Sequence, residues 1–133
     1  METKKEELSL HLETLKKALA TLKEVLLEPY SLVARDAAIQ RFEYTFELTW
    51  KVLKKISKIE GMESPSPRHA LRAAHQLGLI SNPDLWFEFL DDRNQTSHTY
   101  SGLTADKVFN GAKKLPPALD DLIDAVQKKY QTS

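Results

Sequence analysis

The sequence predicts an all-α protein, an up-and-down four-helix bundle with an additional short helix. Apolar residues recur at alternating spacings of four and three in long segments, as in helices that pack together in a bundle. Most glycines and prolines fall between those segments, and no alternating apolar and polar stretch is long enough to predict a strand. With 133 residues, the chain is expected to form one domain over residues 1–133.

The first two predicted helices span residues 4–28 and 36–60. Pro29 ends the first helix. Asp36 is the expected N-cap of the second, and Gly61 suits a left-handed cap at its C-terminus. Both helices carry a stripe expected to face the core: Leu8, Leu12, Leu15, Leu19, Leu22 and Leu26 in the first, and Ile39, Phe42, Phe46, Trp50, Leu53 and Ile56 in the second.

A short third helix and a longer fourth helix follow. Ser66 is the expected N-cap of the third helix, and Gly78 can close it. The fourth helix begins near Pro83, with Ser81 or Asn82 as its cap. Its predicted buried face consists of Leu85, Trp86, Phe89 and Leu90.

The last helical segment starts near Thr104 and contains two adjacent prolines, Pro116 and Pro117. Its apolar spacing crosses both prolines without losing phase. Because an interior proline removes a backbone hydrogen bond and bends a helix, we expect one helix kinked at Pro116–Pro117, or two nearly collinear helices.

The composition excludes several kinds of site. Without cysteine, the chain has no disulfide, thiolate zinc site, iron–sulfur cluster or cysteine nucleophile. The sequence also lacks a phosphate-binding loop and a dinucleotide-binding fingerprint, so we expect no cofactor. The 19 basic and 19 acidic side chains give zero net charge, which argues against a global positive field and leaves only a local basic cleft for nucleic acid.

The N-terminal segment carries too many charges for a signal peptide. No segment approaches the roughly 20 apolar residues that span a bilayer. The sequence therefore predicts a soluble cytoplasmic protein without membrane contact.

Arg93 is the most informative residue about function, because it continues the apolar stripe of the fourth helix. Trp86 and Leu90 precede it by seven and three positions. A charge in that stripe must be paired, reach solvent, or line a cleft or subunit interface. A structural ion pair with Glu43 or Glu47 is one interpretation, and a functional arginine is the other.

His98 and Tyr100 follow Arg93 by five and seven positions. If the helix continued, Asn94 and His98 would share one face, and Tyr100 would return to the face of Arg93. An end of the helix between Thr96 and Tyr100 would instead let His98 turn toward the arginine.

An arginine and a histidine suit cleavage of a phosphodiester without a metal. A histidine with an unperturbed pKa of about 6.5 exchanges a proton at neutral pH. An arginine binds a phosphate through two hydrogen bonds, and RNA carries its own nucleophile, the 2′-hydroxyl. Two such pairs across a symmetric dimer would supply both a base and an acid. Because this spacing also arises often by chance, it leaves both interpretations of Arg93 open.

Other polar residues are weaker candidates. His69 and His75 are six positions apart, which is not the metal-binding spacing of adjacent helical turns, and surface histidines explain them better. Asp91 and Asp92 are adjacent and point to different faces of a helix, so we expect them to solvate it. No metal site is predicted.

Three segments resemble the HEPN-superfamily proteins called nucleotidyltransferase substrate-binding proteins, or HepT-like toxins. Together they cover the middle half of the chain, and the flanking helices agree in length and pattern. The third is the most specific: an acidic pair, an arginine, four residues, a histidine, one residue and a tyrosine. The segments are RFEYTFELTWKVLKK (41–55), SPRHALRAAHQLGLI (66–80) and WFEFLDDRNQTSHTY (86–100).

The resemblance implies a HEPN-like bundle that forms a homodimer, or a higher oligomer, with the two motifs facing each other. It also implies a partner, a minimal nucleotidyltransferase encoded nearby. In one family role, the protein is a metal-independent ribonuclease toxin that cleaves RNA. Arg93 and His98 would then be catalytic, Asn94 would support them, and the partner would attach AMP to Tyr100.

In the other family role, the chain is a non-catalytic subunit that binds a nucleotide or substrate for the nucleotidyltransferase. The motif favours a functional Arg93 and the toxin role. Arg68 and Lys51 are candidate phosphate or RNA contacts, although pairing on a helix surface explains them equally well. A purely structural bundle is the third alternative.

Overall fold

The computed structural model describes residues 2–132, which form six α-helices, one short 3-10 helix and no strand. The predicted domain also includes residues 1 and 133, which lie outside the described residues. In chain order the helices are α1 (Glu2–Leu26), α2 (Leu32–Ile59), α3 (Pro67–Gln76), α4 (Pro83–Asn94), η1 (Thr96–His98), α5 (Gly102–Ala112) and α6 (Leu115–Tyr130).

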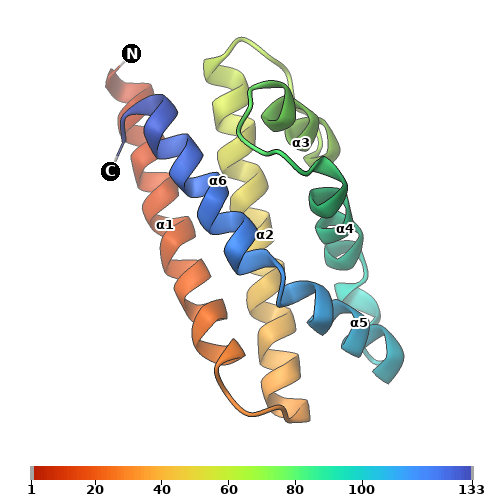
Figure 1. The fold of residues 1–133 in the computed structure, drawn as a ribbon. Helices are drawn as coiled ribbons and strands as arrows, with labels where there is room; N and C mark the ends of the chain where they lie inside the picture. The colour runs from red at the N-terminus through yellow and green to blue at the C-terminus, as the bar shows by residue number, and fades with distance from the viewer. Residues whose placement is uncertain (1, 133) are drawn as a thin grey trace.

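The helices run alternately up and down, which confirms the predicted bundle (Figure 1). The long helices α1 and α2 lie antiparallel, α4 runs back along α2, and α5 with α6 returns the chain to the end where α1 begins. Helix α2 is central, because it contacts α1, α3, α4, η1 and α5. The short helix α3 packs beside α2 and α4.

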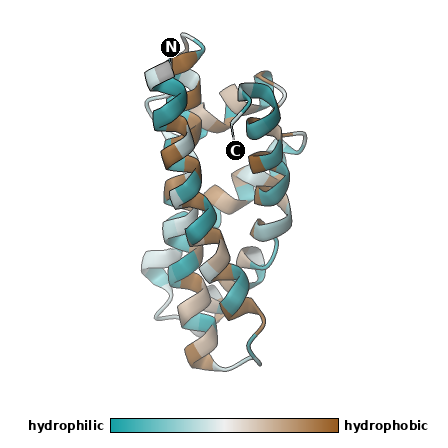
Figure 2. Cartoon of the chain, turned by 90° about the vertical axis from the view of Figure 1, so that its left-hand side faces the viewer, coloured by the Kyte–Doolittle hydropathy of each residue, from teal (hydrophilic) through white to brown (hydrophobic). Residues whose placement is uncertain are grey.

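One hydrophobic cluster joins all six α-helices, because each contributes its apolar stripe to it. Figure 2 shows hydrophobic and hydrophilic residues alternating along the helices, as expected when one face of each is buried. All but three residues of the predicted apolar stripes are buried in this cluster. Leu26, Trp50 and Leu85 are only partly buried and pack against its rim.

Side-chain caps define where the helices begin, and one differs from the prediction. Helix α2 begins four residues before Asp36, because the Ser31 hydroxyl accepts a hydrogen bond from the Ala34 amide at 3.0 Å. Asp36 instead accepts from Arg35 Nε at 3.0 Å. Asn82 is the cap of α4, one of the two residues predicted.

Three further residues predicted at helix ends lie where expected. Ser66 caps α3, and Gly61 and Gly78 follow α2 and α3 with φ of +76° each. That left-handed conformation lets the chain turn away from a helix end without the strain that a side chain would add.

The predicted break in the last segment is present, and it lies just before the prolines. Helix α5 ends at Ala112 and α6 starts at Leu115, so the chain turns at Lys113–Lys114. Pro116 and Pro117 sit in the first turn of α6, where backbone amides need no partner within the helix. The apolar stripe continues across the turn into the core.

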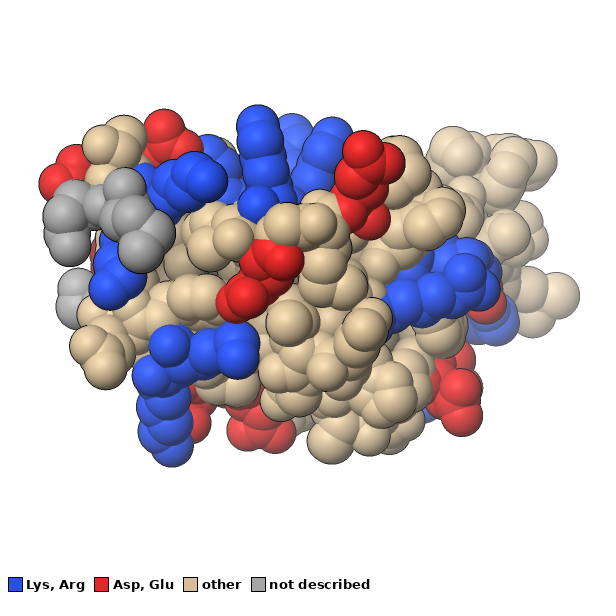
Figure 3. All heavy atoms as spheres, turned by 90° about the horizontal axis from the view of Figure 1, so that it is seen from above, with Lys and Arg blue, Asp and Glu red and all other residues tan. Residues whose placement is uncertain are grey.

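The surface is charged without a dominant sign. Figure 3 shows basic and acidic side chains interspersed over the end of the bundle that carries the two termini. This agrees with the zero net charge of the sequence. Within the described range, each helix is too short or too polar to cross a membrane.

Two leucines on α1 test the packing. Leu12 is fully buried and Leu10 is 69% exposed. We expect Leu12→Ala to lower the free energy of unfolding by about 2–5 kcal/mol, because it removes buried methyl groups and leaves a cavity. The matched control, Leu10→Ala, should change it by less than about 0.5 kcal/mol. Urea denaturation measures both, and equal effects would contradict this arrangement of α1.

Candidate active site

Arg93 lies in the last turn of α4 and forms an ion pair with Glu47 of α2. Its side chain is 36% exposed, so the guanidinium lies at the edge of the core with access to solvent. Arg93 Nη1 also lies 3.5 Å from Asn94 Oδ1. A guanidinium has five N–H donors, and this pairing leaves donors for an anionic ligand.

Two carboxylates of α2, one helical turn apart, hold the end of α4. Glu47 accepts a hydrogen bond from Trp50 Nε1 at 2.9 Å besides pairing with Arg93. Glu43 accepts one from the Thr96 hydroxyl, which lies only 2.7 Å from the Arg93 carbonyl oxygen. The arginine and the start of η1 are therefore fixed against the same face of α2.

Helix α4 ends at Asn94, before the interval from Thr96 to Tyr100 in which an end would let His98 turn toward Arg93. His98 closes η1, where its amide donates to the Gln95 carbonyl at 2.9 Å. Its side chain is exposed, and its ring centroid lies 6.2 Å from that of Tyr100 in an edge-on arrangement. No hydrogen bond joins the side chains of Arg93 and His98 among the residues that the structure describes.

Tyr100 is 87% exposed, so a second protein can reach its hydroxyl. The residues Arg93, Asn94, His98 and Tyr100 thus lie on one short segment at the surface. The two remaining candidates are separate from it. Arg68 lies on α3 with its guanidinium 4.8 Å from the centroid of the Phe87 ring.

Lys51, the other candidate phosphate contact, is exposed on α2. It follows Glu47 by four residues and so lies on the face of α2 that carries the ion pair with Arg93. Of the two predicted phosphate contacts, Lys51 is therefore the one placed on the same side of the bundle as the arginine.

A buried carboxylate that the sequence did not predict lies next to the arginine. Asp92 is only 6% exposed, whereas its neighbour Asp91 is exposed, so the prediction that both solvate the helix is wrong for Asp92. Asp92 Oδ1 lies 3.4 Å from Lys107 Nζ. Its carboxylate also packs so closely on Gly111 that a Cβ there would collide with it.

Asp92 and Gly111 therefore bring α4 and α5 into close contact. Burial raises the pKa of the Asp92 carboxyl, and the Lys107 ammonium opposes this rise. An isolated glycine inside a predicted helix was the available signal for such a contact, since it marks close approach of another group.

The other titratable candidates have local roles or none. His69 Nδ1 lies 2.6 Å from the hydroxyl of Ser66, the residue that caps α3, and His75 is exposed. Among residues 2–132, no three histidine or acidic side chains are grouped so that they could hold a metal ion.

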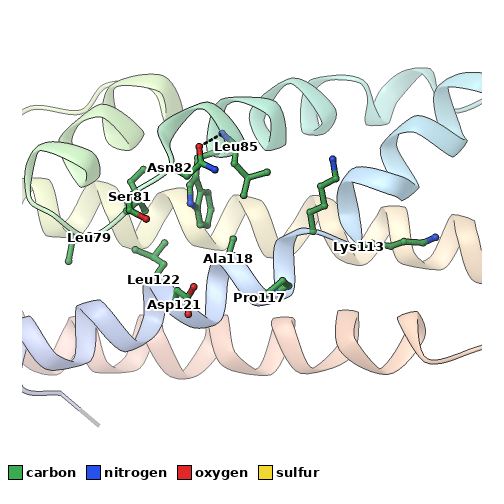
Figure 4. A pocket seen from close by; sticks show the side chains of 12 residues that line it. Leu79, Ser81, Asn82, Leu85, Lys113, Pro117, Ala118, Asp121 and Leu122 are labelled. Carbon is green, nitrogen blue, oxygen red and sulfur yellow. Dashed lines mark hydrogen bonds between the residues drawn. The ribbon is translucent and has the colours of Figure 1, made fainter.

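A groove of about 570 Å³ lies where the loop before α4 meets the join between α5 and α6 (Figure 4). Asn82 accepts from the Leu85 amide at 3.3 Å on one side, and Ala118 and Leu122 of α6 form the other. Its lining contains none of the predicted site residues, so this groove is separate from the Arg93–Tyr100 segment.

The fold is an up-and-down helical bundle that carries the Arg93–Tyr100 segment at its surface. The family model described as "Nucleotidyltransferase substrate binding protein like" matches residues 10–128, and the chain belongs to this family. The resemblance read from the sequence is thereby confirmed.

The chain is also similar to two further proteins. A Haemophilus influenzae protein named "Probable ribonuclease HepT" is 34% identical over 77 residues, which are 54% of this chain and 53% of that protein. The chain thus spans about half the length of this curated relative. A crystal structure of a Thermus thermophilus protein is 41% identical, covers 88% of this chain and 98% of its own, and has a TM-score of 0.72.

Gly111→Ala tests the contact with Asp92. Alanine should stabilise a helix by about 1 kcal/mol relative to glycine, but here its Cβ would displace the buried carboxylate. We expect Gly111→Ala to destabilise the protein by about 1–3 kcal/mol, and to stabilise it in an Asp92→Ala background. A double-mutant cycle by urea denaturation measures the coupling, and additive effects would disprove the contact.

Asp92→Asn tests the buried charge. Because burial raises the folded-state pKa of Asp92, wild-type stability should be lost as pH rises from the unfolded-state pKa through the folded-state pKa. Asparagine does not titrate, so the stability of the variant relative to wild type should increase as the pH rises above the ordinary aspartate pKa of about 3.9. Asp91→Asn, at an exposed position, should show no such trend. A relative stability of Asp92→Asn that falls with pH would contradict the assignment.

Proposed function

We propose that the protein is a metal-independent endoribonuclease of the HepT type, a toxin neutralised by a minimal nucleotidyltransferase that transfers AMP to Tyr100. The observation that carries this proposal is the surface segment from Arg93 to Tyr100, in which an ion-paired arginine is followed by an exposed histidine and an exposed tyrosine whose rings lie near each other. The family and the similarity to a protein named as a probable ribonuclease support it.

The proposed cleavage uses the 2′-hydroxyl of RNA as the nucleophile. Its oxygen attacks the adjacent phosphorus, the bond from phosphorus to the 5′-oxygen breaks, and the products are a 2′,3′-cyclic phosphate and a 5′-hydroxyl. One histidine accepts the proton of the 2′-hydroxyl, and a second acid protonates the leaving oxygen. Arg93 binds the phosphate oxygens and stabilises the charge that develops on them, and Asn94 supports Arg93.

A homodimer would supply the second acid. Each chain carries one His98, on an exposed segment that faces outward from the bundle. Two copies related by a two-fold axis would bring two arginines and two histidines to one RNA backbone. Lys51, on the same face of α2 as Glu47, would extend the phosphate contacts, and Arg68 would lie further out.

Transfer of AMP would block this site. The Tyr100 hydroxyl oxygen attacks the α-phosphorus of ATP, pyrophosphate leaves, and the phenolic proton passes to a base of the partner enzyme. The resulting phosphodiester adds bulk and a negative charge beside His98. Both would exclude an RNA backbone.

A second candidate is a non-catalytic subunit that binds a nucleotide or substrate for the nucleotidyltransferase. The description of the matching family, nucleotidyltransferase substrate binding protein like, favours it. This alternative predicts tight association with the partner enzyme and no RNA cleavage at any protein concentration.

Alanine substitutions at the two catalytic positions test the proposed cleavage. His98→Ala and Arg93→Ala should each lower the rate of RNA cleavage, measured in the presence of a chelator, by about 10²–10⁴-fold. Matched controls are His75→Ala and Arg72→Ala, which alter exposed residues of α3 and should leave the rate unchanged. Circular dichroism checks the fold. Undiminished cleavage by both site variants would disprove the assignment.

A further inference from the structure

An exposed leucine lies beside the tyrosine proposed for modification. Leu103, in the first turn of α5, is 87% exposed and follows Tyr100, also 87% exposed, by three residues. Burying a leucine in a contact with another protein is favourable, so an exposed leucine at the edge of a hollow can serve as an apolar contact for a partner.

Leu103 borders a hollow of about 530 Å³ between α4 and α5. Four carboxylates and two lysines line it. Asp92 and Lys107 lie near each other, as described above, and Asp106 binds Arg35 Nη1 at 3.2 Å.

Glu88 and Asp91 are the remaining two acids of this hollow, and both are exposed. Neither forms an ion pair with another residue in the described part of the chain. With four carboxylates against two lysines, the hollow carries a net negative charge, and Leu103 at its edge is three residues from the acceptor tyrosine in the chain.

A protein that transfers AMP to Tyr100 must bring its own active site to the tyrosine hydroxyl. Its surface must then cover the residues around Tyr100, among which Leu103 is the most exposed apolar one. An enzyme that binds a nucleoside triphosphate carries cationic groups near its active site, because they hold the phosphates. An acidic hollow beside the acceptor complements such a surface.

We propose that this hollow, with Leu103 as its apolar anchor, is the docking surface for the modifying nucleotidyltransferase, and that it binds a patch of apolar and basic side chains on that enzyme. The inference rests on the function proposed above. The ion pair of Arg93 lies on the α2 side of α4, whereas this hollow lies on the α5 side. RNA and the partner enzyme would therefore use different faces of α4, since acidic groups repel an RNA backbone.

Two variants test the docking surface: Leu103→Lys, which removes the anchor, and the double variant Glu88→Lys/Asp91→Lys, which reverses the charge. Matched controls are Leu10→Lys and Glu24→Lys, at exposed positions of α1 on the opposite side of the bundle from α4 and α5 (Figure 1). Affinity for the purified partner nucleotidyltransferase is measured by calorimetry, and transfer of radiolabelled AMP from ATP gives the modification rate. RNA cleavage by each free variant is measured in parallel.

Both docking variants should bind the partner at least tenfold more weakly and accept AMP at least tenfold more slowly, while their RNA cleavage stays within about twofold of wild type. The affinity of the charge-reversed variant should also lose the salt dependence of wild type. The α1 controls should behave as wild type. Circular dichroism confirms folding, and Leu103→Ala provides a milder variant if Leu103→Lys unfolds.

Wild-type affinity and modification in both docking variants would overturn the inference. So would altered RNA cleavage without altered partner binding, because the hollow would then belong to the RNA path. Failure of the proposed function gives a different result: wild-type protein that cleaves no RNA or accepts no AMP. In that case, comparing the partner affinity of wild type and Leu103→Lys by calorimetry still shows whether the partner binds at Leu103.

Discussion

The ion pair between Arg93 and Glu47 is the constraint on which the arrangement of the site depends. Arg93 continues the buried stripe of α4, so its charge must meet a carboxylate where α4 packs on α2. Glu47 provides that carboxylate, and Glu43, one turn earlier, binds Thr96 just beyond the end of α4. The two contacts stop α4 at Asn94 and direct the following residues to the surface.

A second polar contact fixes the other side of α4. Asp92 is adjacent to Arg93 but faces α5, where it packs against Gly111 and lies near Lys107. The end of α4 is thus held by α2 on one side and by α5 on the other, and the connection that carries His98 and Tyr100 runs between these supports. Such anchoring limits the motion of a short segment, which a site that positions a phosphate requires.

Most of the fold could be predicted from the sequence because apolar spacing encodes which face of each helix is buried. Both Ser31 and Asp36 are residue types that cap helices, so the sequence alone does not say at which of them α2 begins. In the structure, Ser31 is the N-cap. The burial of Asp92 depends on the packing of α5 on α4, which the sequence does not encode locally. In the candidate site, the pattern identified Arg93 and the residues after it. Whether Arg93 pairs with Glu43 or Glu47 depends on how α4 is positioned along α2. The residue spacing within one helix does not encode that position.

The most direct measurement is the intact mass of the protein produced together with the proposed partner nucleotidyltransferase, followed by peptide mapping. A mass increased by AMP units on Tyr100, and no increase in Tyr100→Phe, is the predicted result. An unmodified protein in a stable complex with the nucleotidyltransferase would contradict the toxin function and support a binding subunit.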